Sequence, residues 1–277
     1  MPALTLHLLA IAPPTTPESF VAQLSKSPEA RIIVASRPRH TVVHPTILDK
    51  HPLTNTKWDL LLLLQPTNPA TPSTNPIPAS LQDAIKSEYK LTAGIPSKLL
   101  STYPEKDKTL KSTPQPPLTG SLSKALSKES KSTSQNLELS PDLIAFMDEL
   151  CKTHTGPVTM LNLLHFNHPH GKKSYFNYGQ AFIPVAGKRG GDAKLVGNVV
   201  RPADGARDSR GENGRPAEEW WNEISIVHYP SIRHFCDMLA GEDYQGINEE
   251  HRLSALRDTF LLCTTEFDVE SLASSKL

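Results

Sequence analysis

Residues 157–166 read PVTMLNLLHF, and this stretch decides the fold of the second half of the chain. It is too short for a core helix, it is rich in Val, Thr, Met, Leu and Phe, and chain breakers flank it as Gly156-Pro157 and Asn167-His168-Pro169. We therefore predict a buried strand. Both of its alternating faces are largely apolar, which indicates a sheet that carries helices on one face and encloses a space on the other.

Two positions of this strand are polar, Asn162 and His165. A buried amide or imidazole without a partner costs about 1–3 kcal/mol. Each side chain therefore needs a hydrogen-bond partner or a ligand, and both are candidates for a site.

Composition excludes several classes of partner. The chain has 277 residues, with 29 Lys plus Arg against 29 Asp plus Glu, and it has no dense basic block. We therefore predict neither a nucleic-acid partner nor a membrane partner. Its three cysteines are widely spaced, which indicates reduced thiols and a cytoplasmic protein. The apolar start of the chain lacks a basic region, so we interpret it as a strand.

The remaining elements follow the same kind of pattern in both halves. The first half predicts strands over 4–12, 31–43 and 57–65 with helices over 17–24 and 79–89, in the order βαββα. The second half predicts a helix over 140–153 and then the order βαββαβ, with the strand of 157–166, a helix over 174–187, strands over 193–201 and 220–229, helical pieces over 231–256, and a strand over 259–267. We predict an α+β protein of tandem ferredoxin-like halves.

A Ser/Pro/Lys-rich segment separates the two halves. Residues 104–136 contain too few apolar side chains to offset the entropy of ordering, so we interpret them as a linker. The predicted division is a diverged ferredoxin-like half over 1–103, the linker over 104–136, and a second half over 137–277.

The second half also carries residues that resemble a known family. The marks are Pro157-Val158 to Asn162-Leu163-Leu164, Tyr175 and Tyr178, Gly190-Gly191, Trp221, His228-Tyr229-Pro230-Ser231, Asp243-Tyr244-Gln245 and Arg252. As a set, over residues 155–267, they resemble the DUF1330 group of the dimeric α/β-barrel superfamily. The whole chain is similar to a fungal two-half form of that group.

The resemblance implies two βαββαβ units whose sheets face each other around an interior pocket. With both units in one chain, the barrel is either an internal pseudo-dimer or part of a homodimer. The superfamily includes cofactor-independent monooxygenases, lactone isomerases, polyketide dehydratases and haem enzymes. We therefore expect a protein that binds a hydrophobic or aromatic small molecule, either as a cofactor-independent enzyme or as a non-catalytic binding or oligomerisation scaffold.

Candidate site residues are the polar and aromatic side chains of the second half. We assign catalysis to His165, His228, Tyr178 and Arg257, because a histidine can act as a base near neutral pH and an arginine can hold an enolate or carboxylate. We assign substrate binding to Asn162, Tyr175, Glu223 and Tyr244. The structural alternative is that the tyrosines are core residues and that Arg257 pairs with Asp258 or Glu223.

Metal and cofactor motifs are weak in this sequence. His165, His168 and His170 have a spacing that could converge on one ion, but no acidic or cysteine ligand lies at a useful spacing, so we favour solvated histidines. The stretch GKRGG at 187–191 follows a predicted helix rather than a strand, which indicates a helix C-cap and not a phosphate loop. We predict no metal and no cofactor.

Overall fold

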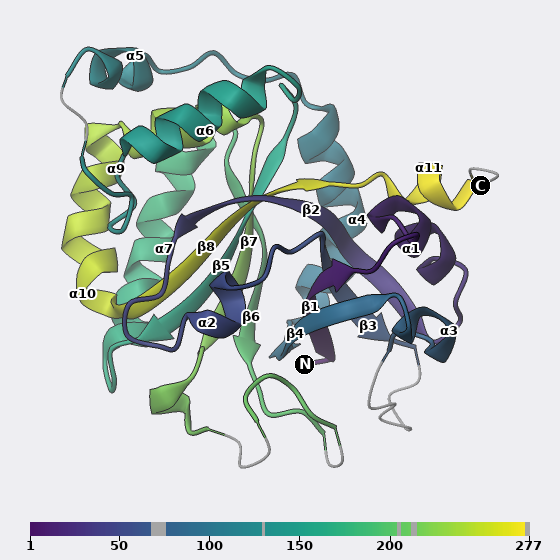
Figure 1. Ribbon diagram of the computed structural model, residues 1–277. Coiled ribbons are helices and arrows are strands. Elements are labelled where there is room, and N and C mark those ends of the chain that lie inside the picture. Colours follow the sequence, from purple (N-terminus) through teal and green to yellow (C-terminus); the bar gives the residue numbers. More distant parts are fainter. Residues whose placement is uncertain (68–75, 129–130, 204–205, 212–214, 275–277) are drawn as a thin grey trace.

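The computed structural model describes residues 1–67, 76–128, 131–203, 206–211 and 215–274. Within them, eight antiparallel strands form a closed barrel in the order β1-β3-β2-β8-β5-β7-β6-β4 (Figure 1). The strands are β1 (Ala3–Ile11), β2 (Ala30–Val43), β3 (Leu60–Pro66), β4 (Ile85–Gly94), β5 (Val158–Phe166), β6 (Asp192–Val199), β7 (Glu223–Tyr229) and β8 (Leu256–Glu266).

Each half of the chain contributes four neighbouring strands, in the orders β4-β1-β3-β2 and β8-β5-β7-β6. The two sets of strands meet at two seams. At the first seam β2 pairs with β8 from Ser36↔Glu266 to Val43↔Leu261. At the second seam β4 and β6 share only the pairs Ala93↔Val199 and Gly94↔Asn198. The protein is therefore of mixed α+β class, with one antiparallel sheet built from both halves.

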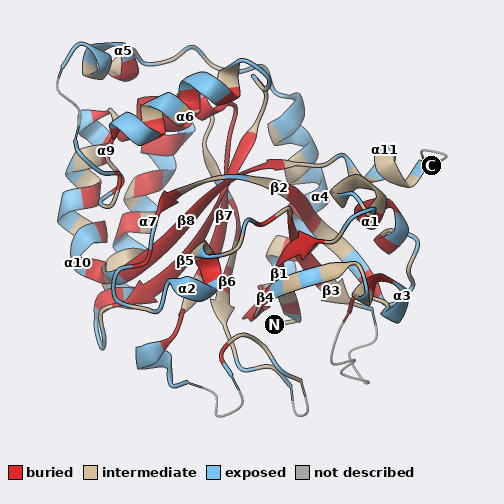
Figure 2. Cartoon of the chain, viewed as in Figure 1, coloured by how far each residue is buried: buried red, intermediate tan, exposed pale blue. Residues whose placement is uncertain are grey.

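Helices cover the outside of the barrel (Figure 1). Those between residues 141 and 255 gather on one side, whereas most helices of the first half and the C-terminal helix lie on the other, and their solvent-facing sides are exposed (Figure 2). The helices are α1 (Pro17–Leu24), α2 (His51–Thr54), α3 (Ala79–Gln82), α4 (Ser97–Ser112), α5 (Ser121–Leu126), α6 (Pro141–Cys151), α7 (Gly171–Gly187), α8 (Ile232–Leu239), α9 (Glu242–Ile247), α10 (Leu253–Ala255) and α11 (Val269–Ser274).

The strand predicted at 157–166 is confirmed as β5, and every residue of it is buried. Its two faces also divide as the alternation predicts. Leu161 and Leu163 belong to the core inside the barrel, whereas Met160 packs against the helices of the second half.

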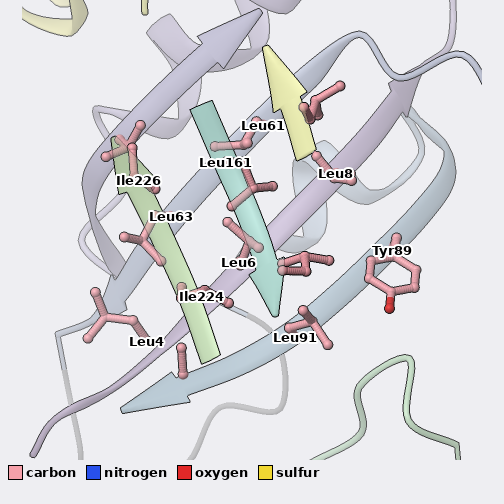
Figure 3. Close-up of a cluster of buried hydrophobic side chains, with 14 of the residues drawn as sticks. Leu4, Leu6, Leu8, Leu61, Leu63, Tyr89, Leu91, Leu161, Ile224 and Ile226 are labelled. Atoms are coloured by element: carbon pink, nitrogen blue, oxygen red, sulfur yellow. The ribbon is translucent and has the colours of Figure 1, made fainter. Parts of the chain in front are cut away.

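The interior of the barrel is filled by aliphatic side chains. One cluster takes residues from all eight strands. Figure 3 shows its members on β1, β3, β4, β5 and β7. Its members include Leu4, Leu6 and Leu8 of β1, Leu61 and Leu63 of β3, Leu161 and Leu163 of β5, and Ile224 and Ile226 of β7. The resemblance implied an interior pocket. That expectation is wrong, because leucine and isoleucine side chains from both halves fill the interior of the barrel.

The helix predicted over 79–89 is wrong for most of its length. The helix α3 ends at Gln82, and residues 85–94 form β4, which pairs with β1. Tyr89, Leu91 and Ala93 face the interior, while the half-exposed or exposed alternate positions carry Lys86, Glu88 and Lys90. These charged residues are good helix formers, so the local sequence favours a helix although buried and exposed positions alternate. Pairing and packing against β1 determine that the segment is a strand.

The segment 104–136, interpreted from its composition as a linker, contains regular elements. The helix α4 continues to Ser112, and α5 follows. Buried Asp237 anchors the connection between them, because its carboxylate accepts hydrogen bonds from the backbone N–H groups of Thr119 (3.1 Å) and Leu122 (2.9 Å). Polar contacts to the second half thus order a segment that is poor in apolar side chains.

Candidate functional site

A cavity of about 450 Å³ lies on the outer face of the second half's sheet. Strands β5, β6, β7 and β8 form its floor, and α7, α8 and α9 supply its walls. This volume falls in the range of small-molecule sites, and most of the lining is apolar or aromatic. The site is therefore between sheet and helices, outside the barrel.

The floor of the cavity carries polar groups in two adjacent rows. Asn162 pairs with Ser225 across β5 and β7. In the next row Leu164 pairs with Glu223 on one side and with Thr259 on the other. Glu223 and Thr259 are thus two strand spacings apart, about 10 Å. Of these three residues, Glu223 lines the cavity, whereas Leu164 and Thr259 are buried outside its lining.

The walls are rich in tyrosine. The rings of Tyr175 and Tyr178 on α7 lie 5.2 Å apart between centroids, and the hydroxyls of Tyr178 and Tyr244 are 3.4 Å apart. Burial raises the pKa of all three phenols, so they stay protonated and can donate hydrogen bonds. A planar aromatic ligand would find both stacking faces and hydroxyl donors here.

Glu223 is the carboxyl group of this floor. Burial raises the pKa of Glu223 to about 7, and the nearby charge of Lys172 opposes that rise only in part. The Lys172 ammonium itself donates a hydrogen bond of 2.7 Å to Asn198. A carboxyl group with a pKa near neutrality can both release and accept a proton at physiological pH.

Arg252 brings a buried positive charge to the cavity. Its side chain is 3 % exposed, and it lies in the π-helical turn Asn248–Arg252 between α9 and α10. Its guanidinium donates to the Asn248 side-chain oxygen at 3.5 Å and to the Thr259 hydroxyl at 3.3 Å, both neutral acceptors. Within the described residues, Arg252 forms no ion pair with a carboxylate.

Five of the residues assigned from sequence line this cavity together. They are Asn162 of β5, Tyr175 and Tyr178 of α7, Glu223 of β7 and Tyr244 of α9. The structure therefore brings all four predicted substrate-binding residues and one predicted catalytic residue into one place.

The two predicted catalytic histidines do not share this site or any other. Both face the interior side of the sheet, His228 opposite Thr159 and His165 opposite Asp258. Thr159 and His165 are about 20 Å apart along β5, at 3.3 Å per residue. Because β5 and β7 are antiparallel, histidines near the C-terminal ends of both strands lie at opposite ends of the barrel. A site that uses both of them is therefore excluded.

Each histidine has its own surroundings. The Nδ1 atom of His165 lies 2.7 Å from the Trp220 carbonyl oxygen, whereas both ring nitrogens of His228 are buried and have no partner among the described residues. Burial, together with the nearby Lys194 charge, lowers the pKa of His228 to about 4. Both imidazoles are therefore neutral near pH 7, and neither lines the cavity.

Arg257 is exposed and also lies outside the cavity lining. The guanidinium of the site belongs to Arg252, five residues earlier. Arg252 was one of the marks of the family resemblance, and that was the only signal in the sequence for it. Ser225 was missed as well, although it follows Glu223 at the strand period of two.

The three histidines considered as a metal site differ in burial. His165 is buried, whereas His168 and His170 are exposed. Over the described ranges, no three His, Cys, Asp or Glu side chains are placed to hold a metal ion. Nor does any described helix combine the length and apolar character needed to cross a membrane.

Comparison with known proteins gives only distant similarity. No protein-family model matches the sequence, and no curated protein does either. A structure described as a "putative monooxygenase" from Lactobacillus acidophilus NCFM is 8% identical over 96% of this chain and 93% of its own, with a TM-score of 0.47. The RPA0582 protein of unknown function from Rhodopseudomonas palustris is 24% identical over 46% of this chain and 93% of its own, with a TM-score of 0.34.

Proposed function

We propose that this protein binds a hydrophobic or aromatic small molecule in the cavity between β5–β8 and α7, and that it catalyses proton transfer on that molecule without a cofactor. One observation carries the proposal, a carboxyl group with a pKa of about 7 on the floor of a largely apolar cavity. Burying an ionisable group there costs stability, and a general base is the ordinary use of such a group. Reactions of the isomerase or dehydratase type depend on this chemistry.

Each residue of the site has a role in this proposal. The carboxylate of Glu223 takes a proton from the ligand and returns it elsewhere. The guanidinium of Arg252 holds a ligand oxygen away from the reacting position and so fixes the orientation of the ligand. The protonated hydroxyls of Tyr175, Tyr178 and Tyr244 orient the ligand, while Asn162 and Ser225 contact it from the floor.

For the architecture, we propose tandem ferredoxin-like halves of the DUF1330 type, with the division 1–103, 104–136 and 137–277. The identical relative strand order of the two halves supports this reading. The site lies wholly on the second half except for Lys106 of α4, which pairs with Asp192 at the cavity edge (2.6 Å).

The proposal is tested by identifying a retained ligand and measuring its hydrogen exchange. Protein purified from its own host is analysed by native mass spectrometry, and the released compound, or a panel of aromatic ketones if none is retained, is incubated with the protein in D2O. We expect NMR to show deuterium incorporation with a rate that rises through about pH 7. Glu223→Gln should lower that rate by about 10²–10⁴-fold.

The control is Glu270→Gln, which changes an exposed carboxyl group on α11, away from the cavity. It should leave the exchange rate unchanged. Exchange that is equal in the wild type and in Glu223→Gln would contradict the catalytic proposal. A ligand that binds without any exchange would instead identify a binding protein without activity.

A further inference from the structure

Arg252 defines what kind of ligand the cavity takes. A buried cation without an anionic partner costs several kcal/mol in a protein interior, and removing one partner of a buried pair is destabilising for that reason. The two hydrogen bonds of this guanidinium go to neutral oxygens at 3.3 and 3.5 Å, which is long for a charged donor. Among the described residues, the guanidinium therefore has no carboxylate partner.

The surroundings of Arg252 show where an anion would lie. The guanidinium charge opposes the burial effect on the pKa of Tyr175, Tyr178 and Tyr244, so it lies within electrostatic range of all three phenols. These three side chains line the cavity together with Arg252. An anion at the guanidinium would thus also meet hydroxyl donors and the edges of aromatic rings.

The position of Glu223 limits the ligand further. The Arg252 guanidinium donates a hydrogen bond to the Thr259 hydroxyl, and Leu164 of β5 lies between Thr259 of β8 and Glu223 of β7. The anion subsite and the carboxyl group are therefore at separate ends of the floor, consistent with the spacing of about 10 Å between Thr259 and Glu223. A ligand that uses both must have an apolar body between its anionic group and its reacting position.

We propose that the cavity is specific for an aromatic carboxylate, whose carboxylate binds Arg252 and whose ring system extends over Asn162 and Ser225 toward Glu223. A carboxylate fits a single guanidinium bidentately, whereas a phosphate dianion would need further cationic donors. The two lysines of the lining are engaged elsewhere, Lys106 with Asp192 and Lys172 with Asn198. The inference deepens the proposed function and rests on it, because it concerns the ligand of the same cavity.

Binding of matched probes to the wild-type protein tests this inference without mutation. The probes are 2-naphthoate, its neutral isostere 2-naphthamide, and 2-naphthyl phosphate, titrated by isothermal calorimetry at pH 6, where Glu223 is mostly protonated. We expect 2-naphthoate to bind at least about tenfold more tightly than 2-naphthamide, as for a charge-assisted bidentate pair. Equal affinity of these two probes, or tighter binding of the phosphate, would overturn the inference.

Variants then locate the charge. Arg252→Gln should abolish the preference for 2-naphthoate, and Arg252→Lys, which keeps the charge, should retain part of it. If 2-naphthamide binds as well as 2-naphthoate, the carboxylate assignment fails while the small-molecule site stands. If none of the probes binds the folded wild-type protein, both the assignment and the aromatic site fail.

Discussion

At the scale of single residues, Glu223 links the site to stability. Its folded pKa of about 7 lies above the ordinary value of 4.5, so the folded protein holds the proton more tightly than the unfolded chain does. Ionisation of Glu223 therefore costs almost no folding stability below about pH 4.5, and the loss of stability grows as pH rises to about 7. Glutamine mimics the protonated form. We expect Glu223→Gln to stabilise the protein by less than about 1 kcal/mol at pH 5 and by about 1–3 kcal/mol at pH 8, where the upper value is reduced because the group is half-buried.

Urea unfolding of both proteins at the two pH values measures this difference. The exposed substitution Glu270→Gln should shift the midpoint at neither pH. A stabilisation by Glu223→Gln that is equal at pH 5 and pH 8 would show that Glu223 titrates normally.

At the scale of elements, α8 holds the segment between the halves through Asp237. Its carboxylate is 0 % exposed and accepts hydrogen bonds from Thr119, Leu122 and the Arg189 Nε atom (3.1 Å). Asp237→Ala removes one partner of a buried pair, so we expect a loss of about 3–5 kcal/mol. We also expect faster amide exchange over 117–126 than in the rest of the protein.

Hydrogen exchange with mass spectrometry and urea unfolding measure both effects. Asp142→Asn is the control, because the Asp142 side chain is 80% exposed and its pair with His40 should contribute at most about 1 kcal/mol. A uniform rise in exchange over the whole chain would mean that Asp237 supports the barrel rather than this segment.

The helices and strands that the sequence predicted correctly are those with a strong local residue pattern. The strand β5 was predicted because breakers flank an apolar run, and its two faces were predicted because side chains alternate. In contrast, β4 was missed because its outward Lys and Glu residues favour a helix locally. Asn162, a polar position in an apolar strand, and Glu223, a candidate binding residue, both line the cavity. The histidines were misplaced because strand order, which no local pattern contains, decides which strand ends meet.

At the scale of the whole molecule, the filled barrel couples the two halves. Leu161 of the second half and Leu63 of the first belong to one interior cluster, and each is at most 1 % exposed. Either half alone would expose one apolar face of its sheet, so we expect one cooperative unfolding transition rather than two. Leu161→Ala should cost about 2–5 kcal/mol and should raise amide exchange in β3 of the first half as much as in β5.

Exchange measured on peptides from β3 and β5 in low urea tests this coupling. Leu253→Ala is the control, because Leu253 is 37 % exposed on α10 and its loss should change neither peptide. Faster exchange in β5 alone would mean that the halves unfold separately. Coupled exchange would mean that ligand binding in the second half's cavity also stabilises the first half, by the free energy of binding to the folded state. The first half would then serve the site by completing the barrel on which the floor of the cavity is built.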